Sequence, residues 1–250
     1  MKKEIIRGLN GYAIPCLHNL RGREKMAVII SHGFGSSKES PTAQAMAAAL
    51  PEQGIGTYSF DFPAHGDSPV DGRELRISNC LKDLAAVEAQ VHRLLPEAEI
   101  AYFSSSFGAY INLIYLATHR PKGNKSFLRC AAVDMPGLFR RGTSPEQCTQ
   151  LKEQGHYTLD LNFIRPLKIT RDFYDDLERH DLFKLCRPDM AEIAMIHGDA
   201  DETAPVAEAR RFAAQFGGKL TEVKGGDHRL ATPERQKQVI DRAVQFFINK

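Results

Sequence analysis

A stretch near the middle of the chain, residues 100–110, constrains the fold more than any other. It reads Ile-Ala-Tyr-Phe-Ser-Ser-Ser-Phe-Gly-Ala-Tyr, so β-prone residues pass through three serines into an apolar helical pattern. A strand that turns sharply into a helix through small residues is typical of a nucleophile elbow, where a strained backbone pushes one side chain outward. The sequence therefore predicts that Ser106, two residues before Gly108, projects from this turn.

The turn departs slightly from the usual G-x-S-x-G pattern. It reads S-x-S-x-G, with Ser104 in the first glycine position, and serine is the mildest change where strand and helix approach closely. Serine-rich turns also cap helices, because the hydroxyl accepts a hydrogen bond from a free backbone N–H. Ser104 or Ser105 could also act as the nucleophile, although their positions in the pattern favour this less than that of Ser106. The rest of the chain has to decide between these interpretations.

Composition narrows the class of protein. A chain of 250 residues with net charge +2, 42% hydrophobic and 26% charged residues is of the size and balance of one α/β domain, which we expect to span residues 1–250. The absence of a basic stripe argues against nucleic acid as a partner. No apolar run approaches the roughly 18 residues that span a bilayer, so we expect no membrane segment.

The five cysteines are dispersed and show no C-x-x-C spacing. An odd, scattered set predicts buried thiols in a reducing compartment, and therefore a cytoplasmic protein without a disulfide framework. The histidines show no metal-ligand spacing either, so the sequence predicts no metal site.

Strand-like and helix-like segments alternate along most of the chain. Asn10-Gly11 marks a hairpin turn at the start. The expected strands, besides the one entering the elbow, are residues 4–9, 12–18, 26–30, 54–61, 127–133, 191–197 and 219–223. The expected helices, besides the one leaving the elbow, are residues 39–51, 78–95, 204–216 and 233–248. This alternation predicts a mostly parallel sheet with helices on both faces, and ligands bind beyond the carboxyl ends of such strands.

The alternation pauses over residues 138–185, which are more polar. We expect a helix near 145–154, an extended stretch over 157–169 and a helical segment over 171–185. An insertion of this size after the end of a strand is usually a small cap over the site.

Chemistry-capable residues follow several of the expected strands. Ser106 follows one strand, Asp201 a later one and His228 the last. A serine hydroxyl needs a base to become a nucleophile, and the base needs an orienting carboxylate. Because strand ends of a parallel sheet meet at one edge, these three residues form a candidate triad, in the chain order expected for an α/β-hydrolase.

Five motifs in order carry a resemblance over nearly the whole chain. They are His32–Gly35, Asp61–Ser68, Ser104–Gly108, His197–Pro205 and Gly225–His228. Together they resemble the α/β-hydrolase superfamily. The chain is most similar to small bacterial carboxylesterases of the cinnamoyl (feruloyl) esterase type, because of the segment Arg171–Leu177 and the modest cap between the sixth and seventh core strands.

The resemblance implies a serine carboxylic-ester hydrolase that works through an acyl-enzyme and needs no cofactor. Ser106 would attack the acyl carbonyl of a small-molecule ester, His228 would move its proton, and Asp201 would hold the imidazole. The backbone N–H groups of Phe34 and Phe107 would form the oxyanion hole.

Several assignments have competitors. Asp199 and Asp134 are alternative acids, although the family pattern places the acid four residues after a histidine and four before a proline, as at Asp201. We interpret Asp227 as a carboxylate that stabilises its loop. Three further histidines at strand ends or in turns are expected to be structural: His32, His65 and His197.

Substrate preference is the least defined property. Tyr157, Phe163 and Tyr174 could line an acyl or aryl pocket together with Phe34 and Phe107, or could pack the cap onto the body. A thioesterase, a lipase-like enzyme or a peptidase would use the same triad. A peptidase is disfavoured, because the chain lacks a propeller or large lid, and a non-catalytic binding protein of this fold would usually have lost a triad residue. The natural acyl and alcohol groups and the oligomeric state stay open.

Overall fold

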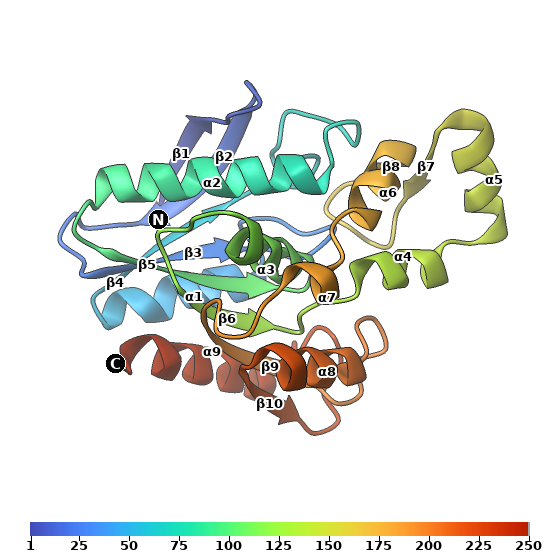
Figure 1. Cartoon of the computed structure of the whole chain (residues 1–250). Coiled ribbons are helices and arrows are strands. Elements are labelled where there is room, and N and C mark those ends of the chain that lie inside the picture. Colours follow the sequence, from blue (N-terminus) through green and yellow to red (C-terminus); the bar gives the residue numbers. More distant parts are fainter. Residues whose placement is uncertain (250) are drawn as a thin grey trace.

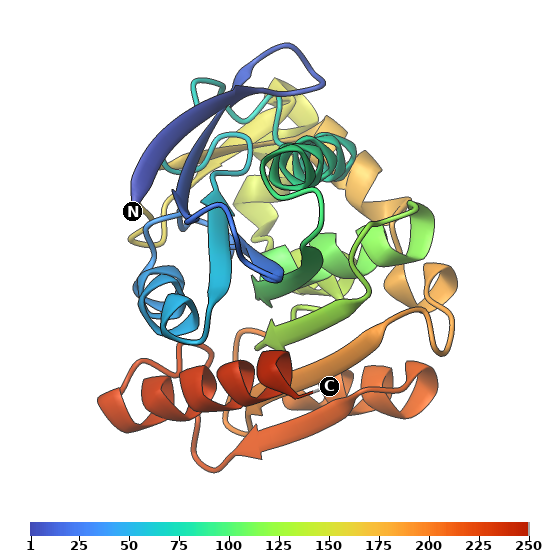
Figure 2. The same ribbon diagram turned by 90° about the vertical axis from the view of Figure 1, so that its left-hand side faces the viewer.

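An eight-stranded sheet runs through the protein in the computed structural model, which describes residues 1–249 (Figures 1 and 2). Its strands are β1 (Lys2–Arg7), β2 (Ala13–Asn19), β3 (Met26–Ser31), β4 (Ile55–Phe60), β5 (Glu99–Ser105), β6 (Lys125–Arg129), β9 (Glu192–Gly198) and β10 (Lys219–Val223). Their order is β1-β2-β4-β3-β5-β6-β9-β10. The strands from β4 to β10 in this order pair in parallel, and the hairpin β1–β2 adds to β4 in antiparallel fashion. The predicted mostly parallel sheet is confirmed.

Helices cover both faces of the sheet and bury one apolar cluster on each. One face carries α1 (Pro41–Glu52) and α9 (Pro233–Ile248), and the other carries α2 (Ile77–Leu94), α3 (Phe107–Thr118) and α8 (Val206–Phe216). Strand β3 serves both clusters, because Ile29 packs on the α2–α3 side and Val28 on the α1–α9 side. Its continuous apolar run is the expected signature of a strand buried on both faces.

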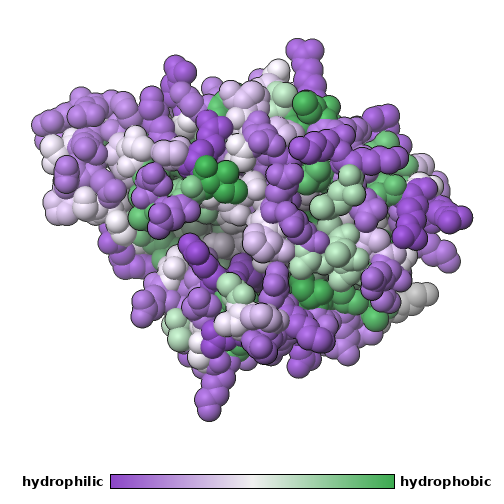
Figure 3. Space-filling view, turned by 180° about the vertical axis from the view of Figure 1, so that it is seen from behind, coloured by the Kyte–Doolittle hydropathy of each residue, from purple (hydrophilic) through white to green (hydrophobic). Residues whose placement is uncertain are grey.

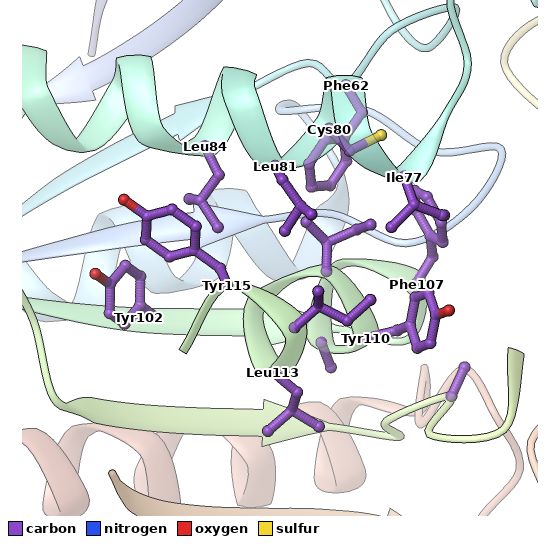
Figure 4. Packing of buried hydrophobic residues seen from close by; sticks show 14 of the residues in the cluster. Phe62, Ile77, Cys80, Leu81, Leu84, Tyr102, Phe107, Tyr110, Leu113 and Tyr115 are labelled. Atoms are coloured by element: carbon purple, nitrogen blue, oxygen red, sulfur yellow. The ribbon is translucent and has the colours of Figure 1, made fainter. Parts of the chain in front are cut away.

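Helix α3, which follows the serine turn, packs against α2. Leu81 and Leu84 of α2 face Tyr115 and other side chains of α3 (Figure 4). The buried carboxylate of Glu88 accepts hydrogen bonds from the hydroxyls of Tyr102 and Tyr115. A buried acid needs such partners, so these bonds hold α2, β5 and α3 in one register.

An inserted segment, residues 135–185, lies between β6 and β9, beyond the arrowheads of the central parallel strands (Figure 1). It consists of α4 (Met135–Gly142), α5 (Pro145–Gln154), the hairpin β7 (His156–Leu159) and β8 (Leu167–Thr170), α6 (Arg171–Glu178) and α7 (Leu182–Leu185). Its helices contact α2 and α3, the helices that follow β4 and β5. A role as a cap over the site stays a prediction.

The first strand lies two residues earlier than expected, at Lys2–Arg7, and three further elements end differently for a clear reason. The strand expected over 127–133 is β6, which stops at Arg129, because Cys130 adopts a φ of 44° and Ala132 N–H then donates to Ser106 O rather than to a strand. The extended stretch 157–169 is two short strands with a turn between them. The helix expected over 171–185 is two helices, because the carboxylate of Asp181 accepts from Phe183 N–H and starts a new one.

The expectations drawn from composition, that the chain has no membrane segment and that its thiols are buried, can be compared with the structure. The face shown in Figure 3 is mainly hydrophilic, with apolar side chains in separate patches. Within residues 1–249 no helix combines the length and the apolarity needed to cross a bilayer. All five cysteines are free thiols, four of them buried as predicted, but Cys148 is exposed. The cytoplasmic location stays a prediction.

A buried carboxyl in the second turn of α2 makes a testable contribution to stability. Asp83 is fully buried, accepts a hydrogen bond from the Tyr12 hydroxyl at 3.1 Å, and keeps its second oxygen without a partner among residues 1–249. Burial raises the pKa of Asp83 from 3.8 to about 7, although hydrogen bonds from Tyr12 and Asn10 oppose the rise. Between about pH 4 and pH 7 this carboxyl is therefore largely protonated in the folded protein and largely ionised in the unfolded one.

Asp83→Asn should raise the free energy of unfolding at pH 8 by about 2–4 kcal/mol and have little effect near pH 4. Between these limits the unfolded carboxyl ionises while the folded one holds its proton, so wild-type stability falls as pH rises. Urea denaturation at pH 4, 6 and 8 measures the difference. The exposed Asp160 provides the control, Asp160→Asn, with a small effect at each pH. A pH-independent effect of Asp83→Asn would contradict the prediction.

Candidate active site

Ser106 occupies the turn between β5 and α3, with a φ of 51° and a ψ of −114°. A positive φ in a residue other than glycine is strained and persists only where the surrounding structure imposes it. Ser106 stands at the N-cap position of α3, yet its side chain makes no capping hydrogen bond. The hydroxyl is therefore available for another partner, and the capping interpretation does not describe this serine.

Close packing beneath the turn accounts for its small residues. A Cβ on Gly108 would lie 2.5 Å from His32 O and 2.7 Å from Ser31 O, because α3 begins directly against the end of β3. A Cβ on Gly33 would lie 3.3 Å from Ser106 Cβ. Ser104 is fully buried and its hydroxyl has no partner among residues 1–249, so it occupies the glycine position without making a polar contact.

His228 connects Ser106 to Asp201. Its Nε2 lies 2.9 Å from Ser106 Oγ and its Nδ1 lies 2.7 Å from Asp201 Oδ2. An ionised carboxylate only accepts, so Nδ1 carries the proton that is donated to Asp201. In the neutral ring Nε2 is then the acceptor for the hydroxyl of Ser106. The structure thus brings together the three residues that the sequence placed after separate strands.

The carboxylate of Asp201 is fully buried and held on both oxygens. Oδ1 accepts from Thr203 N–H at 2.9 Å and from Ala204 N–H at 2.8 Å, and Oδ2 lies 3.1 Å from His197 Nε2. Burial alone would raise the pKa of Asp201, but hydrogen bonds from His197, His228 and Ala204 lower it well below its usual range. Asp201 is therefore ionised at neutral pH and can stabilise a charged imidazole.

Two backbone N–H groups near the hydroxyl are free to bind an oxyanion. Within residues 1–249, neither Phe34 N nor Phe107 N donates to a protein acceptor. Phe107 is the first residue of α3, so its N–H also lies at the positive end of the helix dipole. These are the two groups that the resemblance assigned to the oxyanion hole.

A buried ion pair fastens the loop that carries Phe34. Lys38 Nζ lies 2.8 Å from Asp61 Oδ2, and both side chains are buried. Asp61 also accepts from Lys38 N–H at 2.7 Å and from Asp67 N–H at 2.9 Å. Asp61 therefore joins the loop after β3 to the loop after β4.

His32 makes a second link between the same two loops. Its Nδ1 donates to Gly33 O at 2.8 Å and its Nε2 accepts from Phe62 N–H at 3.1 Å. Burial lowers the pKa of His32 to about 4, which keeps the ring neutral, as this pair of bonds requires. His65 is also buried and donates from Nδ1 to Pro63 O. Both histidines thus tie loops together.

The competing acids have other partners. Asp134 caps α4 by accepting from Gly137 N–H at 3.0 Å and also pairs with Arg141. Asp199 accepts from Gly225 N–H at 2.6 Å. Asp227 accepts from Leu230 N–H at 2.9 Å within the loop of His228. Among these carboxylates and Asp201, only Asp201 contacts the ring of His228.

The aromatic residues expected in the pocket divide into two groups. The hydroxyls of Tyr157 and Tyr174 lie 2.9 Å apart, and that of Tyr174 also contacts Thr143 Oγ1. The hydroxyls of both tyrosines therefore form hydrogen bonds with other residues of the inserted segment. Phe163 instead covers the loop of Phe34, because a Cβ on Gly35 would lie 2.1 Å from its ring.

Phe34 lies at the centre of an aromatic cluster above the turn. Five rings surround it with centroids 5.3–6.0 Å away: His65, Phe107, Phe139, Phe163 and Phe173. Phe139, Phe163 and Phe173 come from the inserted segment, and of these only Phe163 was among the expected pocket residues. The two residues with free N–H groups, Phe34 and Phe107, belong to this cluster, and the ring of Tyr174 packs against its members Phe139 and Phe173.

Sequence reasoning also missed Arg129, the last residue of β6. Its main-chain O accepts from Ser106 N–H at 2.9 Å. Its nearly buried guanidinium donates to His228 O at 3.3 Å and to Arg229 O. Arg129 thus contacts both the serine turn and the histidine loop, a relation that becomes visible only when β6 lies beside β5 and β9.

The fold is shared with known proteins. The family described as serine aminopeptidase, S33, matches residues 22–172. A protein from Agrobacterium vitis S4 described as a hydrolase superposes with a TM-score of 0.83 at 21% identity, covering 97% of this chain and 98% of its own. Mouse alpha/beta hydrolase domain-containing protein 10 gives 0.81 at 18%, covering 99% and 98%. Est1E from Butyrivibrio proteoclasticus, solved with ferulic acid bound, gives 0.81 at 18%, covering 97% and 99%. No curated protein matches the sequence significantly.

Proposed function

Because the chain belongs to the serine aminopeptidase S33 family of α/β-hydrolases, we propose that it is a serine hydrolase that cleaves small or medium carboxylic esters through an acyl-enzyme. One observation carries the proposal. His228 lies within hydrogen-bond distance of both Ser106 Oγ and Asp201 Oδ2, at 2.9 and 2.7 Å. A nucleophile, a base and an orienting acid in this relation perform acyl transfer in unrelated folds.

The reaction follows from the protonation states. Ser106 Oγ attacks the ester carbonyl carbon while its proton moves to His228 Nε2, and Asp201 stabilises the imidazolium that results. The negative oxygen of the tetrahedral intermediate lies against the N–H groups of Phe34 and Phe107. His228 then gives its proton to the leaving alcohol, and a water molecule repeats the sequence on the acyl-enzyme and frees the acid. No metal or organic cofactor takes part in these steps.

The aromatic cluster around Phe34 supports apolar or aryl acyl groups as substrates. Est1E, a protein of the same fold, binds ferulic acid, and Phe163 and Phe139 would offer a hydroxycinnamoyl ring suitable edge and face contacts. A thioester or an aminoacyl amide would meet the same nucleophile, and the description of the matching family names an aminopeptidase. These bonds are therefore the alternatives to be tested against esters.

A substrate panel and a covalent probe test the proposal together. The panel contains p-nitrophenyl esters from acetate to palmitate, methyl ferulate, an acyl-CoA and aminoacyl p-nitroanilides. We expect turnover of short esters or ferulate, and labelling of Ser106 by a fluorophosphonate, located by peptide mass spectrometry. Labelling without ester turnover would shift the function to thioesters or amides. A protein that is neither labelled nor active would have no assembled triad.

Replacing Arg129 by methionine should lower kcat about 10- to 100-fold with little change in KM, because His228 would lose the hydrogen bond that holds its loop at the distance for proton transfer. Steady-state kinetics and the rate of fluorophosphonate labelling measure the effect. Arg235→Met is the matched control, since Arg235 donates to Gly225 O in the same loop but does not contact His228. Equal losses in the two variants would contradict a specific role for Arg129.

A further inference from the structure

A cysteine that the proposed mechanism does not use lies beside Asp201 and His228. Cys130 Sγ, a carboxylate oxygen of Asp201 and a ring nitrogen of His228 all lie within 4.8 Å of one another. Cys130 directly follows β6 and is fully buried. Its N–H donates to Ile196 O at 2.8 Å, so the cysteine lies beside β9, the strand that leads to Asp201.

We propose that Cys130, Asp201 and His228 form a binding site for a soft divalent cation, Zn²⁺, and that the bound ion switches off the hydrolase activity. The proposal rests on the proposed function of the same histidine. Thiolate, imidazole and carboxylate are the ligands from which zinc sites are built. Zinc–ligand bonds of about 2.0–2.3 Å place tetrahedral ligands about 3.3–3.8 Å apart. Small side-chain rotations would reach this spacing, with water as the fourth ligand.

The charges of this ligand set suit a buried dication. On binding, Cys130 releases its thiol proton to solvent, so the ion meets one thiolate, one carboxylate and a neutral imidazole. The sum of these charges and that of Zn²⁺ is zero, which avoids the cost of leaving a net charge in an apolar surrounding. The 20% exposure of the His228 side chain gives the ion a route from solvent.

Binding at either ring nitrogen removes the base. If the ion binds Nδ1, the proton of the neutral ring moves to Nε2, which can then no longer accept the proton of Ser106. If the ion binds Nε2, it occupies the lone pair directly. In both cases Asp201 becomes a metal ligand and no longer orients the imidazole. The ion therefore inhibits the chemical step and has no catalytic role.

Metal binding is measured directly with Co²⁺ as a spectroscopic substitute for Zn²⁺ on the full chain. Wild type should bind one Co²⁺ with a sulfur-to-metal charge-transfer band in the near ultraviolet. Cys130→Ala should abolish the band, and Cys130→Ser, which keeps the size of the side chain, should abolish it as well. Cys148→Ala is the matched control, because Cys148 is the exposed thiol, and should retain the band. A band that survives in both Cys130 variants would overturn the proposal.

Inhibition is measured with buffered free Zn²⁺ and the best ester of the panel, each variant being compared with its own uninhibited rate. Wild type and Cys148→Ala should lose activity reversibly, with recovery on adding EDTA. The Cys130 variants should need about tenfold or more free Zn²⁺ for the same fractional loss. Equal sensitivity in all variants would reject the site. If wild type hydrolyses no ester but shows the Cys130-dependent band, the proposed function fails while the metal site stands.

Discussion

Ser106→Ala should lower kcat for ester hydrolysis by a factor on the order of 10⁶, to a residual rate supplied by the oxyanion hole and substrate binding. The loss is expected to be this large because the serine, histidine and aspartate of such a triad act as one unit, and alanine removes the hydroxyl oxygen that lies 2.9 Å from His228 Nε2. The spectrophotometric assay with a p-nitrophenyl ester measures it, after gel filtration to remove contaminating esterases. Fluorophosphonate labelling should disappear in the same variant.

The neighbouring serines supply the controls. Ser105→Ala and Ser104→Ala each remove one hydroxyl oxygen from the same turn, as Ser106→Ala does. The hydrogen bond to His228 comes from Ser106 and from neither of these two serines. Both variants should keep activity within a few-fold of wild type. Circular dichroism and the thermal midpoint should show that all three variants are folded, since alanine suits this tightly packed turn. Full activity in Ser106→Ala, or a similar loss in Ser105→Ala, would assign the nucleophile elsewhere.

Lys38→Met should destabilise the protein by about 3–5 kcal/mol, because it leaves the carboxylate of Asp61 buried and without its cation. The exposure of the two side chains is 3% and 0%, so water cannot replace the lost partner. Hydrogen bonds to Asp61 and Asp67 raise the pKa of Lys38 against the opposing effect of burial, so the lysine is charged in the folded state. Urea denaturation at pH 7 measures the free energy of unfolding.

Two controls distinguish the loss of the buried ion pair from an unspecific effect of the substitution: a variant in an exposed ion pair and a double variant. Arg73→Ala breaks the exposed pair with Asp71 and should leave the free energy of unfolding nearly unchanged, because water replaces the lost partner. Lys38→Met combined with Asp61→Asn removes both charges and should recover part of the stability lost in Lys38→Met alone. The single variant should also lose activity, because the loop of Phe34 would no longer be fastened. A loss no larger than that of Arg73→Ala would refute the buried pair as an anchor.

Local sequence patterns were sufficient to predict a strand, helix or turn wherever the hydrophobic periodicity and the turn residues of a segment agreed with the fold. The apolar run at 26–30, the hairpin signal at Asn10-Gly11 and the alternation of strands and helices predicted the parallel sheet and its covering helices. These patterns did not predict the ends of elements that are set by contacts with residues far away in the chain. Ala131 and its neighbours look like the end of a strand, but they are buried by the serine turn. The inserted segment was divided wrongly because the ends of its short elements depend on single caps such as Asp181.

The candidate site shows the same division. Residue types and order predicted that Ser106, Asp201 and His228 lie close together, because each follows a strand and the strands of a parallel sheet share an edge. The structure places them within hydrogen-bond distance, and their catalytic roles stay a proposal. No sequence pattern marks Arg129, Lys38 or Cys130. The sequence does not distinguish a buried arginine, lysine or cysteine from an exposed one. The role of such a residue depends on which chain segment packs against it.

Residues close in the chain, together with the order of the strands, are sufficient to indicate the α/β class, the strained serine turn and the residue types of the candidate triad. Tertiary packing alone sets the distances within the candidate triad, the free N–H groups of Phe34 and Phe107, and the aromatic cluster around Phe34. Those features arise between residues far apart in the chain, and packing places them. Directional hydrogen bonds and close contacts require atoms within a few ångströms, which sequence order alone does not specify.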